Sequence, residues 1–282
     1  MNSSESRAKI HFPTVIGIPE KELIALINDI DKYYKEWEEI KNDKSTGLPK
    51  TYKDGTIKKR VIRPSKTKLK IIQSRINERI LNLIDLPNNI HGGRKKHSNV
   101  TNAKPHQGKK YILTTDLKDF YPSVSYKTVY NSFLKLGFNK QCAFYLTRLT
   151  TWKEELPQGT PTSTHISNII FLETDLKLIE VCKGLNITYT RYIDDLTFSA
   201  PYDFQDFIEG ILEIIKDSGL KISWRKTLYS NKQTITGIKI YLNKIGAPEK
   251  ILNKVEEEKL LPEGSPKPYT NYNNHIIKIS KN

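Results

Sequence analysis

The chain of 282 residues carries 46 Lys and Arg against 31 Asp and Glu, and its formal net charge of +15 favours an acidic partner, usually nucleic acid, with a membrane surface as the alternative. Its hydrophobic share of 37% is low for a globular protein, but a chain of this length can still bury a core. No apolar run approaches bilayer-spanning length and the polar N-terminus lacks the apolar core of a signal peptide, so we expect a soluble, intracellular protein.

The N-terminal third is predicted to contain two helices and a hairpin. Residues 19–40 have apolar side chains at helical spacing and predict one helix, and residues 68–84 predict a second. Between them, Asp54 and Gly55 separate two alternating runs, a pattern typical of a β-hairpin. The segment 88–110 predicts an ordered loop or a short helical piece. The return strand of the hairpin is expected to carry Lys58, Lys59, Arg60 and Arg63.

The rest of the chain alternates between strand-like and helical runs. Cys142 and Cys182 fall in different predicted helices without CxxC spacing, so we expect buried thiols rather than a disulfide or a zinc site. The predicted elements, in chain order, are a strand at 111–117, helices at 125–137 and 140–152, a long helix after the turn at 156–161, a hairpin within 187–200, a helix at 204–220, strands at 220–230 and 234–242, a short helix at 247–261 and a final polar run.

Three carboxylates are predicted to stand at strand ends. Asp194 and Asp195 lie at a tight turn in the apolar run 187–200, and Asp116 ends a strand-like run before an aromatic pair and a proline. Phosphoryl transfer to a growing strand needs two divalent ions held by oxygen ligands about 4 Å apart, which carboxylates on adjacent strand ends provide. We expect Asp116 and Asp194 to bind both ions, with Asp195 more peripheral and the Leu117 carbonyl completing a shell. An Asp–Asp pair alone also suits an ordinary solvated turn.

The order of the motifs resembles that of reverse transcriptases. The LPQG motif of that family is matched by Leu156–Gly159, its YxDD hairpin by Tyr192–Asp195, and the lysine of a later strand by Lys226. The Asp-bearing strand of the family, followed by an acid and two aromatics, is matched by Asp116, Asp119, Phe120 and Tyr121. Four motifs in the family's order make coincidence a weak explanation.

Within that family the chain resembles the retron reverse transcriptases of bacteria. Their NAxxH signature is matched by residues 102–106 and their VTG triplet by residues 235–237, and the phrase YTRYxDDLTxS is also typical. Ile193 replaces an alanine within YxDD, Tyr121 a phenylalanine and Ile235 a valine, which are mild departures. Only the 45 residues from 238 to 282 follow the triplet, which is short for the helical thumb of retron enzymes.

The resemblance implies an α+β, right-hand polymerase fold with fingers, a palm and a reduced thumb, in which a palm sheet carries the three Asp. Residues 1–110 would form the fingers and N-terminal helices with the retron-like NAxxH loop. Residues 111–230 would form the palm with interleaved finger elements, and residues 231–282 a primer-grip strand and a short thumb.

The resemblance also implies roles in nucleotide binding. Tyr121 matches the ring that stacks under the incoming sugar and excludes a 2′-hydroxyl, and Gln158 matches a residue that contacts the incoming nucleotide. Arg60, with Lys59 or Arg63 nearby, is expected to clamp the triphosphate. Without the family pattern, these residues would be a core aromatic, part of a plain turn and a solvated basic strand.

Catalytic and RNA-binding roles are implied for further residues. Lys226 matches a lysine that protonates the departing pyrophosphate, with a surface lysine as the alternative. An RNA-contacting or structural role is implied for Asn102, His106, Thr236 and Gly237. Cations of the polar loop are expected to bind phosphates or to form a solvated face: Arg94, Lys95, Lys96, Lys104, Lys109 and Lys110.

The implied function is RNA-directed DNA synthesis in the bacterial cytoplasm, with two Mg²⁺ ions, or Mn²⁺, as cofactors. The implied partners are dNTPs, a structured noncoding RNA that is both template and primer, its DNA product and a separate effector protein for defence against phage. No membrane partner is expected. Two alternatives remain: a defence-associated reverse transcriptase that makes a different product, and a basic RNA-binding scaffold without turnover.

Overall fold

The computed structural model describes residues 4–43, 47–52, 54–231 and 234–281. The chain forms two compact units, the first from Met1–Asp85 and Tyr121–Ile170, the second from Leu86–Phe120 and Phe171–Asn282. In the part of the chain that the structure describes, no helix combines the length and apolar character needed to cross a bilayer.

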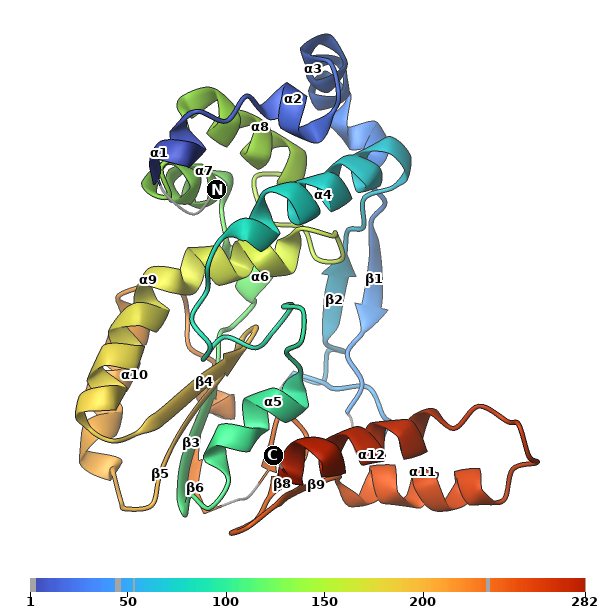
Figure 1. The fold of residues 1–282 in the computed structure, drawn as a ribbon, viewed down its shortest axis with the longest axis vertical. Coiled ribbons are helices and arrows are strands. Elements are labelled where there is room, and N and C mark those ends of the chain that lie inside the picture. Colours follow the sequence, from blue (N-terminus) through green and yellow to red (C-terminus); the bar gives the residue numbers. More distant parts are fainter. Residues whose placement is uncertain (1–3, 44–46, 53, 232–233, 282) are drawn as a thin grey trace. The chain divides into compact units, whose positions relative to one another are not determined.

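The first unit is mainly helical (Figure 1). Its elements are α1 (Ser4–Ala8), α2 (Phe12–Ile16), α3 (Glu20–Asn28), a 3₁₀ turn (Ile30–Tyr33), β1 (Trp37–Ile40), β2 (Lys59–Ile62), α4 (Thr67–Arg79), a 3₁₀ turn (Leu81–Leu83), α6 (Phe120–Ser123), α7 (Tyr126–Lys135), α8 (Lys140–Thr150) and the start of α9 (Ser163–Gly184).

The core of the first unit follows the helical spacing of its apolar residues. In α4, Leu69, Ile72 and Ile76 lie on one face and are fully buried. Gln73 lies on the same face and is satisfied by donating to the Tyr34 hydroxyl and to a backbone carbonyl of α8. The helices predicted for residues 68–84, 125–137 and 140–152 are confirmed, with small differences in their bounds.

A strand replaces the end of the helix predicted for residues 19–40. The helix ends at Asn28, and Trp37–Ile40 forms β1, which pairs antiparallel with β2. The single-helix prediction is therefore wrong beyond Asn28. The reason is tertiary: β1 exchanges backbone hydrogen bonds with β2, and the exposed cross-strand pair Glu39–Arg60 adds an ion pair of 2.8 Å.

The turn predicted at Asp54–Gly55 is confirmed. Gly55 has a φ of +84°, a left-handed conformation that glycine adopts without a steric cost. The Tyr52 N–H donates to the Thr56 carbonyl over 2.8 Å, and the Asp54 carboxylate accepts from the Thr56 N–H over 3.0 Å. The turn closes an isolated bridge between Thr51 and Ile57, outside the regular strands β1 and β2.

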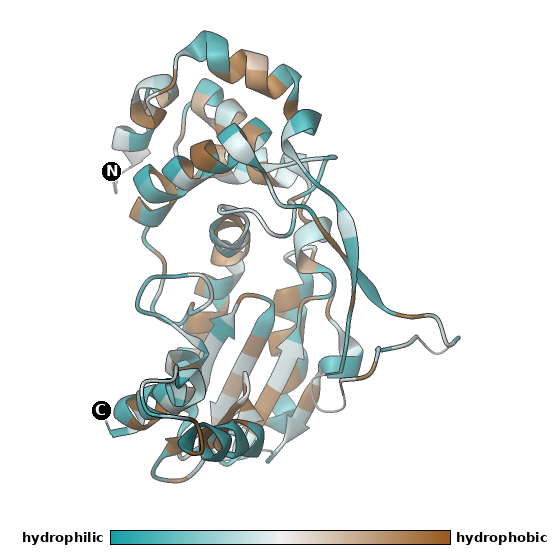
Figure 2. Cartoon of the chain, turned by 90° about the vertical axis from the view of Figure 1, so that its right-hand side faces the viewer, coloured by the Kyte–Doolittle hydropathy of each residue, from teal (hydrophilic) through white to brown (hydrophobic). Residues whose placement is uncertain are grey.

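The second unit is built on a four-stranded antiparallel sheet with the order β4-β5-β3-β6. Tyr189 of β4 donates to Asp175 of α9, whereas the next residue, Thr190, contacts His106. Because successive side chains of a strand point to opposite faces, α9 and the segment at His106 cover opposite faces of the sheet (Figure 1). Figure 2 shows apolar residues concentrated along these strands.

The elements of the second unit confirm most of the predicted pattern, including the hairpin within 187–200. They are α5 (Asn99–Ala103), a 3₁₀ turn (Lys104–His106), β3 (Tyr111–Asp116), the rest of α9, β4 (Thr188–Tyr192), β5 (Asp195–Ala200), a 3₁₀ turn (Gln205–Phe207), α10 (Ile208–Lys216), a 3₁₀ turn (Trp224–Lys226), β6 (Leu228–Ser230), β7 (Thr234–Ile235), β8 (Ile238–Ile240), β9 (Ile245–Gly246), α11 (Glu249–Lys259) and α12 (Pro268–Lys281). Cys142 and Cys182 are free and buried, as predicted.

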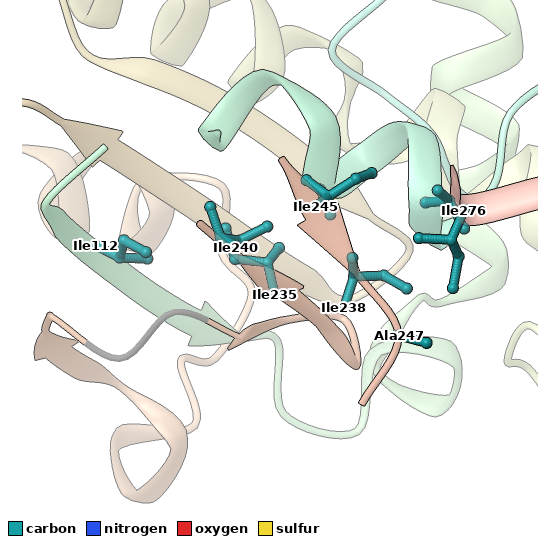
Figure 3. Close-up of a cluster of buried hydrophobic side chains, with 9 residues drawn as sticks. Ile112, Ile235, Ile238, Ile240, Ile245, Ala247 and Ile276 are labelled. Carbon is teal, nitrogen blue, oxygen red and sulfur yellow. The ribbon is translucent and has the colours of Figure 1, made fainter. Parts of the chain in front are cut away.

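A smaller three-stranded sheet, β7-β8-β9, packs with α5 and α12 around a second cluster of isoleucines (Figure 3). Ile238 from β8 and Ile276 from α12 are fully buried in this cluster. The sequence analysis predicts no helix after residue 261, yet α12 forms there. Its Tyr272, Ile276 and Ile279 lie at helical spacing and face the cluster, which supplies the apolar surface that the helix needs.

Candidate active site

The structure brings the three acids to one corner of the second unit. Asp116 ends β3 and is the register partner of Asp195 at the start of β5. The Leu117 N–H donates to the Asp194 carbonyl over 2.9 Å, which fixes the turn that carries Asp194 beside the end of β3. Antiparallel register partners have Cα atoms about 5 Å apart, so the side chains share one space.

Burial distinguishes the three carboxylates. Asp116 is 5% exposed, Asp194 is half-buried and Asp195 is exposed. Burial, and then the negative charge of Asp116, raise the pKa of Asp194 above its ordinary value. The corner thus holds two close carboxylates that repel each other and are only partly hydrated. A bound cation would offset this repulsion.

Lys226 supplies one positive charge at this corner. Its Nζ donates to Oδ2 of Asp116 over 2.5 Å. Burial lowers the pKa of Lys226, but the hydrogen bond to Asp116 and the charge of Asp116 outweigh it and hold the pKa above its ordinary value. Lys226 therefore keeps its proton. It lies in a 3₁₀ turn rather than in the strand predicted for residues 220–230, of which only Leu228–Ser230 forms β6.

The chemistry of the corner fits magnesium. A cavity of about 220 Å³ is lined by Asp116, Asp195, Lys226, Thr234 and Thr236, among others. Within the described residues, no group of three or more His, Cys, Asp or Glu side chains is arranged as a complete metal site. Magnesium usually binds through one or two carboxylates together with waters and substrate phosphates, so an incomplete set of oxygen ligands matches its preference.

A buried ion pair, which the sequence analysis did not single out, supports the acid-bearing turn. Arg191 donates from Nε and Nη2 to the two oxygens of Asp175, over 2.9 and 2.5 Å, and both side chains are fully buried. Nη1 of Arg191 donates over 2.8 Å to the carbonyl of Ile193, which has a φ of +60°. The sequence feature that could have indicated this ion pair is the presence of an Arg and an Asp within otherwise apolar elements.

Gly92 is a second residue that the sequence analysis missed. A Cβ at this position would lie 2.4 Å from Cγ1 and 2.5 Å from the backbone N of Ile193. The neighbouring His91 N–H donates to the Arg191 carbonyl over 2.8 Å, so this segment runs directly beside the turn. Only glycine allows this approach.

The turn of the triplet at residues 235–237 contacts the segment that leads into the NAxxH motif. Thr236 and Gly237 have φ values of +46° and +83° and form the turn between β7 and β8. Asn99 donates over 3.2 Å to the Thr236 carbonyl, and the Thr236 hydroxyl donates over 3.2 Å to the Asn99 carbonyl. Thr236 is half-buried, whereas Gly237 is exposed.

Asn102 and His106 are fully buried. His106 bridges the hydroxyls of Ser199 and Thr190 over 2.6 and 2.8 Å, and burial lowers its pKa to about 3, so the ring is neutral. Asn102 donates to the Thr236 hydroxyl over 3.4 Å, and its Oδ1 has no hydrogen-bond partner among the described residues. Their side chains are not accessible to RNA in this structure. Of the two roles that the resemblance implies, the structural one fits their burial.

The loop cations divide into two groups. Arg94 donates to the carbonyls of Leu86, Pro87 and Ile90, and Lys104 donates to the carbonyl of Ser280 over 2.6 Å, so both hold the backbone together. The other four are exposed or half-buried and are accessible to phosphates: Lys95, Lys96, Lys109 and Lys110.

The candidates for nucleotide binding belong to the first unit. The Arg63 N–H donates to the Gln158 carbonyl over 2.8 Å, which brings these two residues together. The Arg63 guanidinium contacts Glu36 and Glu155 and is 15% exposed, so it already has two carboxylate partners. Arg60 pairs with Glu39.

Tyr121 is half-buried, and its hydroxyl lies 3.1 Å from the Thr164 hydroxyl. The Gly159 turn has a φ of +105° and packs against Ile62 and Pro64.

Comparisons with known proteins agree with the site. Residues 40–240 match the sequence model of the family described as Reverse transcriptase (RNA-dependent DNA polymerase). The Retron Ec86 reverse transcriptase of Escherichia coli is 34% identical over 194 residues, covering 66% of this chain and 59% of that protein. The Retron Se72 reverse transcriptase of Salmonella heidelberg is 30% identical over 223 residues, covering 78% of this chain and 55% of that protein.

Among solved structures, a telomerase from Candida albicans in complex with a fragment of telomeric RNA aligns with a TM-score of 0.41 and 14% identity, over 49% of this chain and 30% of that chain. The chain spans little more than half the length of the two retron relatives. The resemblance to retron reverse transcriptases is confirmed, and so is the α+β, right-hand polymerase fold class.

Proposed function

Because the chain belongs to the reverse transcriptase (RNA-dependent DNA polymerase) family, we propose that it is an RNA-directed DNA polymerase acting by two-metal nucleotidyl transfer. One observation carries the proposal: Asp116, Asp194 and Asp195 meet at one corner of the sheet, with the Lys226 ammonium on Asp116. A basic RNA-binding scaffold would have no need for two close carboxylates at such a corner.

Each residue of the corner has a role in this proposal. Reverse transcriptases as a class use divalent ions, which when bound lower the pKa of the attacking hydroxyl and offset charge on the leaving pyrophosphate. Asp116 and Asp194 would hold Mg²⁺, or Mn²⁺, with Asp195 in a more peripheral role and the Leu117 carbonyl as a further oxygen ligand. Lys226 holds a proton at Nζ and gives it to the pyrophosphate oxygen that leaves.

The nucleotide-binding roles are proposed for the first unit. Tyr121 selects deoxynucleotides, Gln158 contacts the incoming dNTP, and Arg60 and Arg63 bind its triphosphate. In domain terms, residues 1–110 act as fingers, 111–230 as palm with interleaved finger elements, and 231–282 as primer-grip strand and short thumb. Arg60 is the better triphosphate candidate, since its side chain is 48% exposed whereas that of Arg63 is 15% exposed between two carboxylates.

The proposed substrate is a structured noncoding RNA that acts as both template and primer. Its copy is a branched or RNA-linked single-stranded DNA, made in the bacterial cytoplasm for defence against phage together with a separate effector protein. The names of the retron relatives support this substrate, and so does the hydrogen bond from Asn102 of the NAxxH motif to the Thr236 hydroxyl.

Primer extension tests the polymerase proposal. The wild type with magnesium should extend a DNA primer on an RNA template, and Asp194→Asn should extend it at least about a hundredfold more slowly, because oxygen ligands to the ions are worth several kcal/mol. Equal extension by both proteins would overturn the assignment of the corner as the active site.

Sequencing of the nucleic acid that copurifies with the chain tests the substrate. A junction between RNA and DNA would support the retron product. Unbranched DNA without attached RNA would instead favour the alternative of a defence-associated reverse transcriptase with a different product.

A further inference from the structure

A second cavity of the second unit lies outside the acid corner. Its volume is about 580 Å³, and it lies among the loop that follows Asn88, the C-terminal end of α9 and the edge strand β4. A volume between roughly 300 and 1,000 Å³ is typical of small-molecule sites. None of the lining residues belongs to the catalytic or nucleotide-binding sets proposed above.

One wall of this cavity is apolar. It is formed by Ile179 and Cys182 of α9 and by Ile187 and Tyr189 at the start of β4, of which Cys182, Ile187 and Tyr189 are buried. Aliphatic and aromatic surfaces of this kind receive the face of a nucleobase, which is itself apolar and planar.

The rest of the lining is polar and basic, and within the described part of the chain no Asp or Glu belongs to it. Asn88, Lys96 and Lys183 are exposed at its rim. Amide groups match the hydrogen-bonding edge of a base, and lysine ammonium groups match a phosphate. The charges of Lys96 and Lys183 in the lining favour an anionic ligand over a cationic one.

Two histidines complete the polar side. Nδ1 of His91 lies 3.1 Å from Nδ1 of His97 and 3.0 Å from the Thr101 hydroxyl, which fixes both rings. Burial lowers the pKa of His91 to about 4 and also lowers that of His97, so both rings are neutral near pH 7. Because both Nδ1 atoms are engaged in these contacts, each neutral ring has its Nε2 left as one donor or acceptor, which suits an uncharged base edge.

We infer that this cavity binds one unpaired nucleotide, with its base against the wall of Ile179, Ile187 and Tyr189 and its phosphate at Lys96 and Lys183. The inference rests on the proposed function, from which RNA is the available ligand. A strand of RNA is favoured over a free nucleotide because the exposed Lys95 continues the basic rim along the loop and provides for a second phosphate.

The test compares two charge reversals on one helix. Lys183 and Lys177 are both exposed on α9, but only Lys183 lines the cavity. Binding of a labelled ten-nucleotide single-stranded RNA, measured by fluorescence anisotropy at fixed salt, should weaken about tenfold for Lys183→Glu and less than about twofold for Lys177→Glu. The uncharged variant Thr188→Trp, which fills the cavity from β4, should weaken binding to a similar extent.

The same RNA annealed to its complement is the specificity arm, since a paired base cannot enter the cavity. Equal losses for Lys183→Glu and Lys177→Glu, or equal losses for single-stranded and duplex RNA, would overturn the inference. Uridine monophosphate forms a further arm. A loss for Lys183→Glu with the mononucleotide, but not with the strand, would overturn the assignment to RNA and point to a free nucleotide.

Wild-type primer extension, run in parallel, separates this inference from the proposed function. If the wild type extends a primer while both lysine variants bind RNA alike, only the nucleotide pocket is contradicted. If the wild type fails to extend while Lys183→Glu alone loses RNA binding, the pocket stands and the polymerase proposal is contradicted.

Discussion

Asp194 illustrates how a candidate catalytic residue destabilises the fold that holds it. Its pKa is raised, first by burial and then by Asp116, so folding disfavours its charged form. For a raised pKa, the stability contribution is complete below the ordinary Asp value of about 3.9 and is lost as the pH rises through the folded pKa. At neutral pH the ionised Asp194 therefore costs stability.

Asp194→Asn should thus raise the melting temperature at pH 7 by about 2 °C while removing activity. The gain should shrink as the pH is lowered towards 4, because wild-type Asp194 then takes up a proton. Thermal melts across this pH range measure it. Asp206→Asn, at an exposed position, is the control and should change neither the melting temperature nor the activity. A lower melting temperature for Asp194→Asn at pH 7 would contradict the raised pKa.

The Arg191–Asp175 pair links stability to the geometry of the catalytic turn. Arg191→Lys keeps the charge opposite Asp175, but an ammonium lacks the fork that reaches Asp175 and the Ile193 carbonyl together. We expect a folded protein whose kcat for primer extension falls about tenfold with little change in the KM for dNTPs, because a loosened turn misplaces the acids.

Two further variants serve as comparisons for Arg191→Lys. Asp175→Ala leaves a buried guanidinium without its partner and should cost about 3–5 kcal/mol of stability. Arg148→Lys in α8 makes the same chemical change at a half-buried position outside the site and should keep full activity. Unchanged kcat for Arg191→Lys would show that the hydrogen bond to Ile193 is not needed.

At the scale of elements, the segment at Gly92 and the acid-bearing hairpin must fit together. Gly92→Ala places a Cβ within 2.4–2.5 Å of Ile193 atoms, so the turn has to shift. We expect at least about a tenfold loss of extension activity. Gly210→Ala in α10, where a new Cβ meets no atom within 4 Å, should keep activity and stabilise the helix by about 0.5–1 kcal/mol. Equal activity of both variants would contradict the fit.

The small sheet offers a second element-scale prediction. Ile276 is fully buried against it, whereas the next residue of α12, Ile277, is 43% exposed. Ile276→Ala should therefore lower the free energy of unfolding by about 2–4 kcal/mol, and Ile277→Ala by less than about 1 kcal/mol. Urea denaturation measures both. Similar losses would mean that α12 does not pack as the structure shows.

Comparison of elements shows what local patterns can and cannot predict. The hairpin of Asp194 and the helices at 68–84 and 125–152 were predictable because turn residues and apolar spacing are local signals. β1 was not, since WEEI becomes a strand only by pairing with a segment about twenty residues away. α12 was within reach: Tyr272, Ile276 and Ile279 have helical spacing, but preceding Gly and Pro residues suggested a loop.

In the candidate site, too, local patterns predict some residues and tertiary packing determines others. The three acids were predictable because they lie at the end of one strand-like run and at the turn of a predicted hairpin, and Lys226 was placed by its motif although its predicted strand is a 3₁₀ turn. The support of the turn was not predictable, because Arg191, Asp175 and Gly92 come from three separate segments that only the fold brings together. The burial of His106 likewise follows from tertiary packing rather than from its own sequence context.

At the scale of the whole molecule, the formal charge of +15 predicts how RNA affinity responds to salt. Binding that neutralises phosphates releases counterions, and each contact with a single strand adds about −0.7 to the slope of log K against log salt. If the exposed lysines of the loop and hairpin contact five or more phosphates, affinity for single-stranded RNA should fall at least about a thousandfold between 50 and 500 mM salt. Anisotropy titrations at several salt concentrations measure this slope.

Two variants separate the general charge from the catalytic corner. Asp194→Asn should show the same slope as the wild type, because it leaves every cation in place. Replacement of both Lys95 and Lys96 by alanine should reduce the slope by about 1.4, the value for two single-strand contacts, since both side chains are exposed. An unchanged slope after the double substitution would contradict RNA binding by this loop, even if the catalytic corner behaves as proposed.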